Sequence, residues 1–141
     1  NDFSFHPSDT ILNWPKQETP MTDSNKYGDQ RTVTNIYETP LKPYDMEGPV
    51  QENMSYLPLT HNKDGNNMGV YVIRMEPGAE TIAHTHRFNE DYLILDGDLI
   101  EPDGKVLGRG DFVHYEPGTH HNSRTETGCF LIGCDWGGEK S

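Results

Sequence analysis

The sequence has few cysteines and no long apolar runs, and both absences restrict what the protein can be. Its 141 residues include two cysteines, Cys129 and Cys134, which are too few for a disulfide framework. Residues five apart on a regular strand point to opposite faces, so we expect reduced thiols that serve packing. No apolar run approaches the roughly 18 residues of a membrane span, and no secretory signal is visible. We therefore expect a cytoplasmic protein without a membrane segment.

Basic residues are scarce as well. The chain has 11 lysines and arginines against 23 acidic residues, which gives a formal net charge of −12. Nucleic-acid binding requires a basic face, and anionic membranes attract basic segments, so neither partner is expected. The charge does not exclude a small anionic substrate, because a bound metal sets the field of its own site.

Helical periodicity is missing, whereas 14 glycines and 10 prolines are present. This mixture is typical of short strands joined by turns, and the length suits one domain. Residues 1–30 hold three prolines and no lasting periodicity, so we expect an extended N-terminal arm there. Turns are expected at 62–65 and 96–98, among others. Strands are expected at 31–37, 54–59, 68–76, 81–86, 91–95, 99–101, 105–107, 112–115, 121–125 and 129–133, which predicts an all-β, antiparallel, closed or double-sheet structure.

Two histidines one residue apart, followed by a glutamate, form the clearest chemical signal. His84 and His86 would project from the same face of a strand, because side chains alternate along it. Glu90 begins the next expected strand. Imidazole and carboxylate together suit Zn, Fe, Mn or Ni better than Ca or Mg. One ligand from another strand would complete a site with room for water or substrate.

The spacing of these residues resembles the first motif of the cupin superfamily. That motif runs Gly-x5-His-x-His-x3-Glu-x6-Gly. Every fixed position is matched, by Gly78, His84, His86, Glu90 and Gly97.

A later stretch is similar to the second cupin motif, Gly-x5-Pro-x-Gly-x2-His-x3-Asn. Gly110, Gly118 and His121 match it, while Glu116 replaces the proline and Thr125 replaces the asparagine. Neither change affects a ligand position. The loss of the asparagine is expected to remove a common turn-stabilising side chain.

The resemblance implies a double-stranded β-helix, or jelly-roll, barrel in a single domain over residues 31–141, with its core motifs at 78–97 and 110–125. Homodimers are common in this superfamily, so a homodimer is expected. His120 is the rival of His121, but the motif spacing selects His121. The resemblance implies one divalent ion per chain, Fe, Mn, Ni or Zn, bound by His84, His86, Glu90 and His121.

Several other side chains are candidates for contact with a small-molecule substrate. Tyr92 shares strand parity with Glu90, so it is a candidate acid or hydrogen-bond donor, or else it fills the barrel. Tyr71 lies on one face of its expected strand, and Arg74 lies on the other. An inward Arg74 would bind a carboxylate. His114 and Tyr115 point opposite ways, and we list His114 as the substrate-binding candidate although the sequence does not decide between them.

Three functions are compatible with such a site. The first is a metal-dependent cupin enzyme with dioxygenase-like oxidoreductase chemistry on a small oxygen-bearing molecule. The second is a non-catalytic metal or ligand sensor, because residues 118–129 resemble the tail of ChrR-type cupin domains. The third is a cupin lyase, isomerase or decarboxylase.

Overall fold

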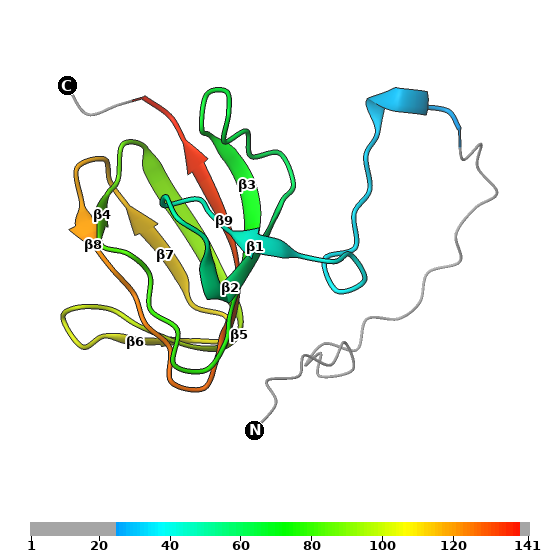
Figure 1. The fold of residues 1–141 in the computed structure, drawn as a ribbon. Coiled ribbons are helices and arrows are strands. Elements are labelled where there is room, and N and C mark those ends of the chain that lie inside the picture. Colours follow the sequence, from blue (N-terminus) through cyan, green and yellow to red (C-terminus); the bar gives the residue numbers. More distant parts are fainter. Residues whose placement is uncertain (1–24, 139–141) are drawn as a thin grey trace.

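The computed structural model describes residues 25–138, and these residues form a β-barrel (Figure 1). One 3-10 turn, η2 (Gly28–Gln30), precedes the strands. No helix in this part of the chain has the length and hydropathy that a membrane crossing requires. The strands are β1 (Lys42–Tyr44), β2 (Gln51–Pro58), β3 (Gly69–Met75), β4 (His84–Thr85), β5 (Asn89–Ile100), β6 (Val106–Gly108), β7 (Phe112–Tyr115), β8 (His120–His121) and β9 (Cys129–Trp136).

The strands form a large antiparallel sheet and a small one. The large sheet has the order β1-β2-β3-β9-β5-β6, and β7 pairs with the first half of β5. The small sheet pairs β4 with β8. It lies across the barrel from β2 and β3 (Figure 1), so side chains from both sheets meet inside. The expected all-β barrel is therefore confirmed.

The barrel core is built by alternate residues of the strands. On β3, Tyr71, Ile73 and Met75 are buried and belong to one apolar cluster, while the side chains between them face outward. Glycine makes room for one of these side chains. A Cβ at Gly133, on the neighbouring strand β9, would lie 2.7 Å from the ring of Tyr71. Only a residue without a side chain therefore fits at this position of β9. Of the two free cysteines, Cys129 lies in the core.

The expected strand at 31–37 is absent, and this prediction was wrong. The backbone turns there instead, because Asn35 Oδ1 accepts a hydrogen bond from the Tyr37 N–H at 2.9 Å. The Asn35 carbonyl also accepts the N–H of Thr39 at 3.1 Å. Short polar side chains that bond their own backbone compete with strand pairing in this way. The arm expected at 1–30 lies mostly outside the described residues, so its boundary stays a prediction.

The expected turn at 96–98 is also absent, because β5 continues through it. The pairing of β5 with β9 shifts register between Ile94 and Asp96, which marks a β-bulge with one extra residue. Gly97 then takes a φ of +83°, and a Cβ there would lie 1.9 Å from the carbonyl oxygen of Gly128. Only glycine fits this conformation and this approach. The glycine that predicted a turn thus allows one long strand, β5, to bend.

The turn that presses on Gly97 is held by two side chains. Asp98 accepts the N–H of Glu126 at 3.0 Å and that of Thr127 at 2.8 Å. Thr125 Oγ1 accepts the Gly128 N–H at 3.0 Å. The expectation that Thr125 would leave this turn without a stabilising side chain was therefore wrong, since its hydroxyl bonds the turn directly.

Candidate metal centre

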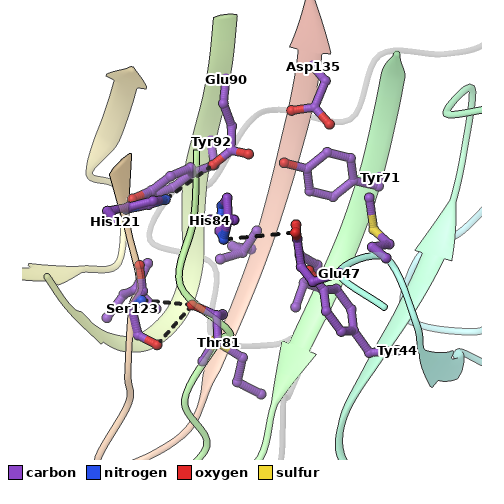
Figure 2. Close-up of a pocket in the computed structure, with 15 residues that line it drawn as sticks. Tyr44, Glu47, Tyr71, Thr81, His84, Glu90, Tyr92, His121, Ser123 and Asp135 are labelled. Atoms are coloured by element: carbon purple, nitrogen blue, oxygen red, sulfur yellow. Dashed lines mark hydrogen bonds and ion pairs between the residues drawn. The ribbon is translucent and has the colours of Figure 1, made fainter. Parts of the chain in front are cut away.

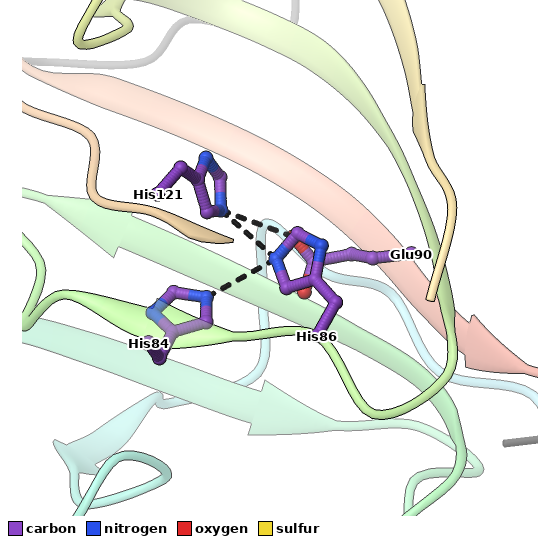
Figure 3. A group of neighbouring side chains, drawn as sticks. All are labelled: His84, His86, Glu90 and His121. Carbon is purple, nitrogen blue, oxygen red and sulfur yellow. Dashed lines mark hydrogen bonds and ion pairs between the residues drawn. The ribbon is translucent and has the colours of Figure 1, made fainter. Parts of the chain in front are cut away.

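Four side chains from three strands and a loop converge inside the barrel (Figure 3). The register of the small sheet places His84 opposite His121. His86 follows β4 directly, and Glu90 is near the start of β5. One ligand atom from each of the four lies within 4.8 Å of the others. The structure thus brings together all four residues that the cupin resemblance selects.

The distances among these atoms match the edges of a metal coordination shell. His86 Nε2 lies 3.2 Å from His84 Nε2 and 2.9 Å from His121 Nε2. Glu90 Oε1 lies 3.3 Å from His86 Nε2 and 4.0 Å from His121 Nε2. Ligands held about 2.0–2.1 Å from one ion are separated by roughly 3 Å. The group therefore has the dimensions of a divalent-metal site.

The hydrogen bonds behind the histidines direct their lone pairs toward this point. His84 Nδ1 donates to the Ile82 carbonyl at 2.8 Å, and His121 Nδ1 donates to Glu101 Oε2 at 2.8 Å. Both Nε2 atoms are thus free of protons when the rings are neutral. Burial, together with the neighbouring His121 and His84, lowers the pKa of His86 to about 4. Neutral imidazoles and one carboxylate oxygen form a donor set that fits a cation.

Glu101 supports this arrangement, although it belongs to no motif that the sequence analysis identified. Its Oε1 accepts hydrogen bonds from Tyr92 and Ser123, each at 2.7 Å. Burial alone raises the pKa of Glu101, but the hydrogen bonds from His121, Tyr92 and Ser123 lower it to about 2. An ionised carboxylate behind a histidine fixes the ring orientation and the tautomer. The available signal was an acid that directly follows the apolar pair Leu99–Ile100.

A cavity of about 50 Å³ lies beside the four side chains. Figure 2 shows its polar members facing one another across the barrel. Hydroxyl groups and carboxylates surround one part, and aliphatic side chains form the remainder. The lining residues are Tyr44, Met46, Glu47, Tyr71, Ile73, Met75, Thr81, His84, Glu90, Tyr92, Leu99, His121, Ser123, Leu131 and Asp135.

Two further carboxylates that the sequence did not indicate lie at this cavity. Glu47, in the loop between β1 and β2, has Oε2 4.0 Å from His84 Nδ1. Asp135 lies opposite Glu90 in the pairing of β5 with β9. Burial raises the pKa of Glu90, and the adjacent Asp135 raises it further. Tyr71 hydrogen-bonds to Glu90 as well. On the far side, His61 Nε2 lies 3.4 Å from Asp135 Oδ2.

The structure separates the candidate substrate residues into two groups. Tyr71 and Tyr92 line the cavity, whereas Arg74 and His114 do not. Arg74 pairs with Glu76, from Nε to Oε1, at 3.0 Å on the outer face of β3. The structure therefore places these two basic side chains outside the cavity, because strand alternation turns them outward.

His114 points outward, so the next residue, Tyr115, faces the site. His114 hydrogen-bonds to Asp91 on the outside of the barrel. The ring of Tyr115 lies 4.7 Å from that of His121 and 5.4 Å from that of His86. His120 is exposed and hydrogen-bonds to Thr85 Oγ1 at 2.9 Å, so it points away from the four converging side chains.

With the fold and the site in view, comparisons with known proteins place the chain in a family. Residues 38–136 match the model of the ChrR cupin-like domain. The match covers more than half of the chain, so the protein belongs to this cupin family. No curated protein matches the chain in sequence.

Solved structures share the fold at low sequence identity. A cupin-like protein of unknown function from Ralstonia eutropha JMP134 is 18% identical, with a TM-score of 0.55 and 61% of each chain covered. A chain from the complex of SigE with the anti-sigma ChrR of Rhodobacter sphaeroides is 15% identical, with a TM-score of 0.57 over 72% of this chain and 51% of that one. An acetylacetone dioxygenase from Acinetobacter johnsonii is 9% identical, with a TM-score of 0.61 over 89% and 81%. The present chain thus spans only part of the first two proteins.

Proposed function

We propose that the protein is a metal-dependent cupin enzyme that acts on a small oxygen-bearing organic molecule, with dioxygenase-like oxidoreductase chemistry. The observation that carries this proposal is the convergence of three imidazole nitrogens and one carboxylate oxygen at the wall of a cavity inside the barrel. Such a set leaves coordination positions open for a substrate. The shared fold with an acetylacetone dioxygenase supports the reaction class.

In this proposal, His84, His86, Glu90 and His121 hold one divalent ion, either Fe, Mn, Ni or Zn. When bound, the ion supplies Lewis-acid polarisation of a substrate oxygen and, if it is redox-active, electron exchange with dioxygen. The remaining steps belong to the protein. The barrel walls shield a bound substrate from part of the surrounding water, which strengthens the polar contacts that it makes.

Neighbouring side chains position the ligands and the substrate. Glu101 orients His121 and keeps its Nε2 unprotonated. Tyr71 and Asp135 hold Glu90 by hydrogen bonds. The Tyr92 hydroxyl donates to Glu101 at 2.7 Å, so its proton is already used. Tyr92 therefore acts through Glu101 rather than on the substrate.

The test combines metal analysis with oxygen uptake. The metal content of the purified protein is measured, and the protein is then mixed with dioxygen and a panel of diketones, keto acids and catechols. Stoichiometric Fe or Mn with substrate-dependent oxygen uptake supports the proposal. Stoichiometric Zn without turnover would reject the dioxygenase chemistry. A lyase, isomerase or decarboxylase would convert a substrate at the same site without consuming dioxygen.

A second candidate is a metal or ligand sensor without catalysis. The match to the ChrR cupin-like domain and the shared fold with a chain of the SigE–ChrR complex favour it. Binding of a ligand without turnover, together with a ligand-dependent change in hydrogen exchange around β4 and β8, would support this function over the enzyme.

The homodimer and the cytoplasmic location stay proposals from the sequence. Sedimentation equilibrium of the metal-loaded protein tests the dimer, since a monomer mass at micromolar concentration would contradict it. Fractionation of cells that express the native gene tests the location.

A further inference from the structure

The cavity beside the candidate metal centre has an acidic wall. Three carboxylates line it, from Glu47, Glu90 and Asp135, and within the described part of the chain no lysine or arginine does. Figure 2 shows Glu47 and Asp135 on the side that carries Tyr44 and Tyr71, facing the histidines. Charges in such a partly buried place are screened less than exposed ones.

The negative charge of the carboxylates around the cavity exceeds the positive charge that a divalent metal would bring. Glu101 adds a fourth carboxylate behind His121, at 2.8 Å. A divalent ion contributes two positive charges, which four carboxylates exceed. An anion that enters would therefore meet repulsion from the walls that the ion does not compensate.

Glu47 lies between two adjoining hollows. It lines the inner cavity and also an adjoining outer groove, which it shares with His84, Glu90 and Asp135. Its loop is tied down two residues earlier, where Asp45 and Lys63 form an ion pair at 2.9 Å.

One basic side chain belongs to the outer groove. Arg87 lines it, with its guanidinium 5.2 Å from the ring of Phe88. The same three carboxylates as in the inner cavity line this groove and outnumber Arg87. The outer groove is therefore acidic as well.

The rest of the cavity suits an uncharged molecule. The Tyr44 hydroxyl lines the cavity and can donate a hydrogen bond to a carbonyl or hydroxyl oxygen. The hydroxyls of Ser123 and Tyr92 already donate to Glu101, so they can only accept a hydrogen bond from a ligand hydroxyl. An aliphatic surface from Ile73, Met75, Leu99 and Leu131 suits a short hydrocarbon body. The volume of about 50 Å³ is far below that of a drug-sized pocket, so the ligand is small.

We propose that the cavity accepts small uncharged molecules with one or two carbonyl or hydroxyl oxygens and rejects carboxylate anions, with Glu47 and Asp135 as the residues that set this preference. The inference rests on the proposed function, because it names the substrate class of the same site. The inference also separates the compounds of the oxygen-uptake test, since diketones belong to the accepted class and keto acids do not.

The test uses two probes of the same heavy-atom skeleton, acetoacetamide and acetoacetate, which differ in charge. Their affinities for the metal-loaded protein are measured by calorimetry. A divalent ion alone prefers the anionic chelator, so the expected preference for the amide, about tenfold or more, can only come from the protein walls. Glu47→Gln and Asp135→Asn should each raise the ratio of the acetoacetate affinity to the acetoacetamide affinity about tenfold. Glu52→Gln, at an exposed position of β2 outside the cavity, is the matched control and should change neither affinity.

The outcomes separate this inference from the proposed function. Equal binding of both probes, tighter binding of acetoacetate, or binding of neither probe would overturn the inference while the metal remains bound. An unchanged ratio in Glu47→Gln would overturn the role of Glu47. Failure to bind any metal would contradict the proposed function, and the ratio measured on the metal-free protein would then still report the effect of the walls.

Discussion

Glu101 accepts a hydrogen bond from His121 Nδ1 at 2.8 Å, and both side chains are buried. This contact fixes which nitrogen of His121 faces the other ligands. Glu101→Gln should lower the metal affinity by about 10–100-fold, because a neutral amide holds the ring and its tautomer less firmly. Competition with a chelating dye measures the affinity. Asp103→Asn, in the exposed turn that follows, is the control, and equal affinities in the two variants would exclude this role for Glu101.

The two adjacent histidines provide a matched pair. His121 is buried among the converging ligands, whereas His120 is exposed and bonds to Thr85. His121→Ala should abolish tight metal retention, and His120→Ala should leave it unchanged. Metal content after dialysis against a weak chelator measures both. The reverse pattern would mean that the other histidine is the ligand.

Tyr92→Phe tests whether its hydroxyl takes part in chemistry. The ring stays in the core, and the hydrogen bond to Glu101 at 2.7 Å is lost. We expect a loss of about 1 kcal/mol in the free energy of unfolding and a decrease in turnover of less than about tenfold, since the group acts through Glu101. A decrease of about a hundredfold or more with unchanged stability would show that the phenol acts on the substrate.

Gly97→Ala should destabilise the protein by about 3 kcal/mol or more, because the new methyl group meets the Gly128 carbonyl and the φ is positive. Gly104 has a similar φ of +86° but open space around it. Gly104→Ala should therefore cost only about 1 kcal/mol. Urea unfolding measures both variants. Similar losses of stability in the two variants would mean that the positive φ, rather than the contact with the Gly128 carbonyl, is the reason for a glycine at position 97.

Asp98 should make the stability depend on pH. Burial alone raises its pKa, but hydrogen bonds from Thr127, Glu126 and Thr125 lower it below the usual value. The folded state then prefers the ionised form, so the contribution of Asp98 is fully present above the unfolded pKa of about 3.9 and is lost as pH falls through the folded pKa.

The comparison of wild type with Asp98→Asn measures this contribution. Unfolding of the metal-free proteins should differ above about pH 5 and converge as the pH falls below about 4. Chelation removes the separate effect of histidine protonation on metal binding. A difference that stays constant to pH 2 would contradict the assignment to Asp98.

The sequence could predict the converging histidines because alternation is a local property. His84 and His86 share a strand face whatever the rest of the fold does, and the motif spacing added His121. Glu47 and Asp135 could not be found this way. Asp135 reaches the site through its pairing with Glu90 across β5 and β9, and Glu47 through the path of a loop. Both depend on contacts between distant parts of the chain.

Local signals also failed where tertiary contacts overrode them. The glycine at position 97 indicates a turn when only its neighbours are considered, yet the approach of Gly128 uses its freedom to bend β5. The same bend concealed Glu101. On a regular strand, Glu90 and Glu101 would face opposite sides of the sheet, since their positions differ by an odd number.

The single extra residue in β5 therefore constrains how the length of this segment can change. Deleting Ile100 while the bulge is kept would move Glu101 by one position and turn it to the outside, while Glu90 stayed within. One codon lost there would remove the carboxylate behind His121 without altering any ligand. The turn at 102–105 carries no such parity requirement, so among natural variants length changes should accumulate there and be purged from the strand.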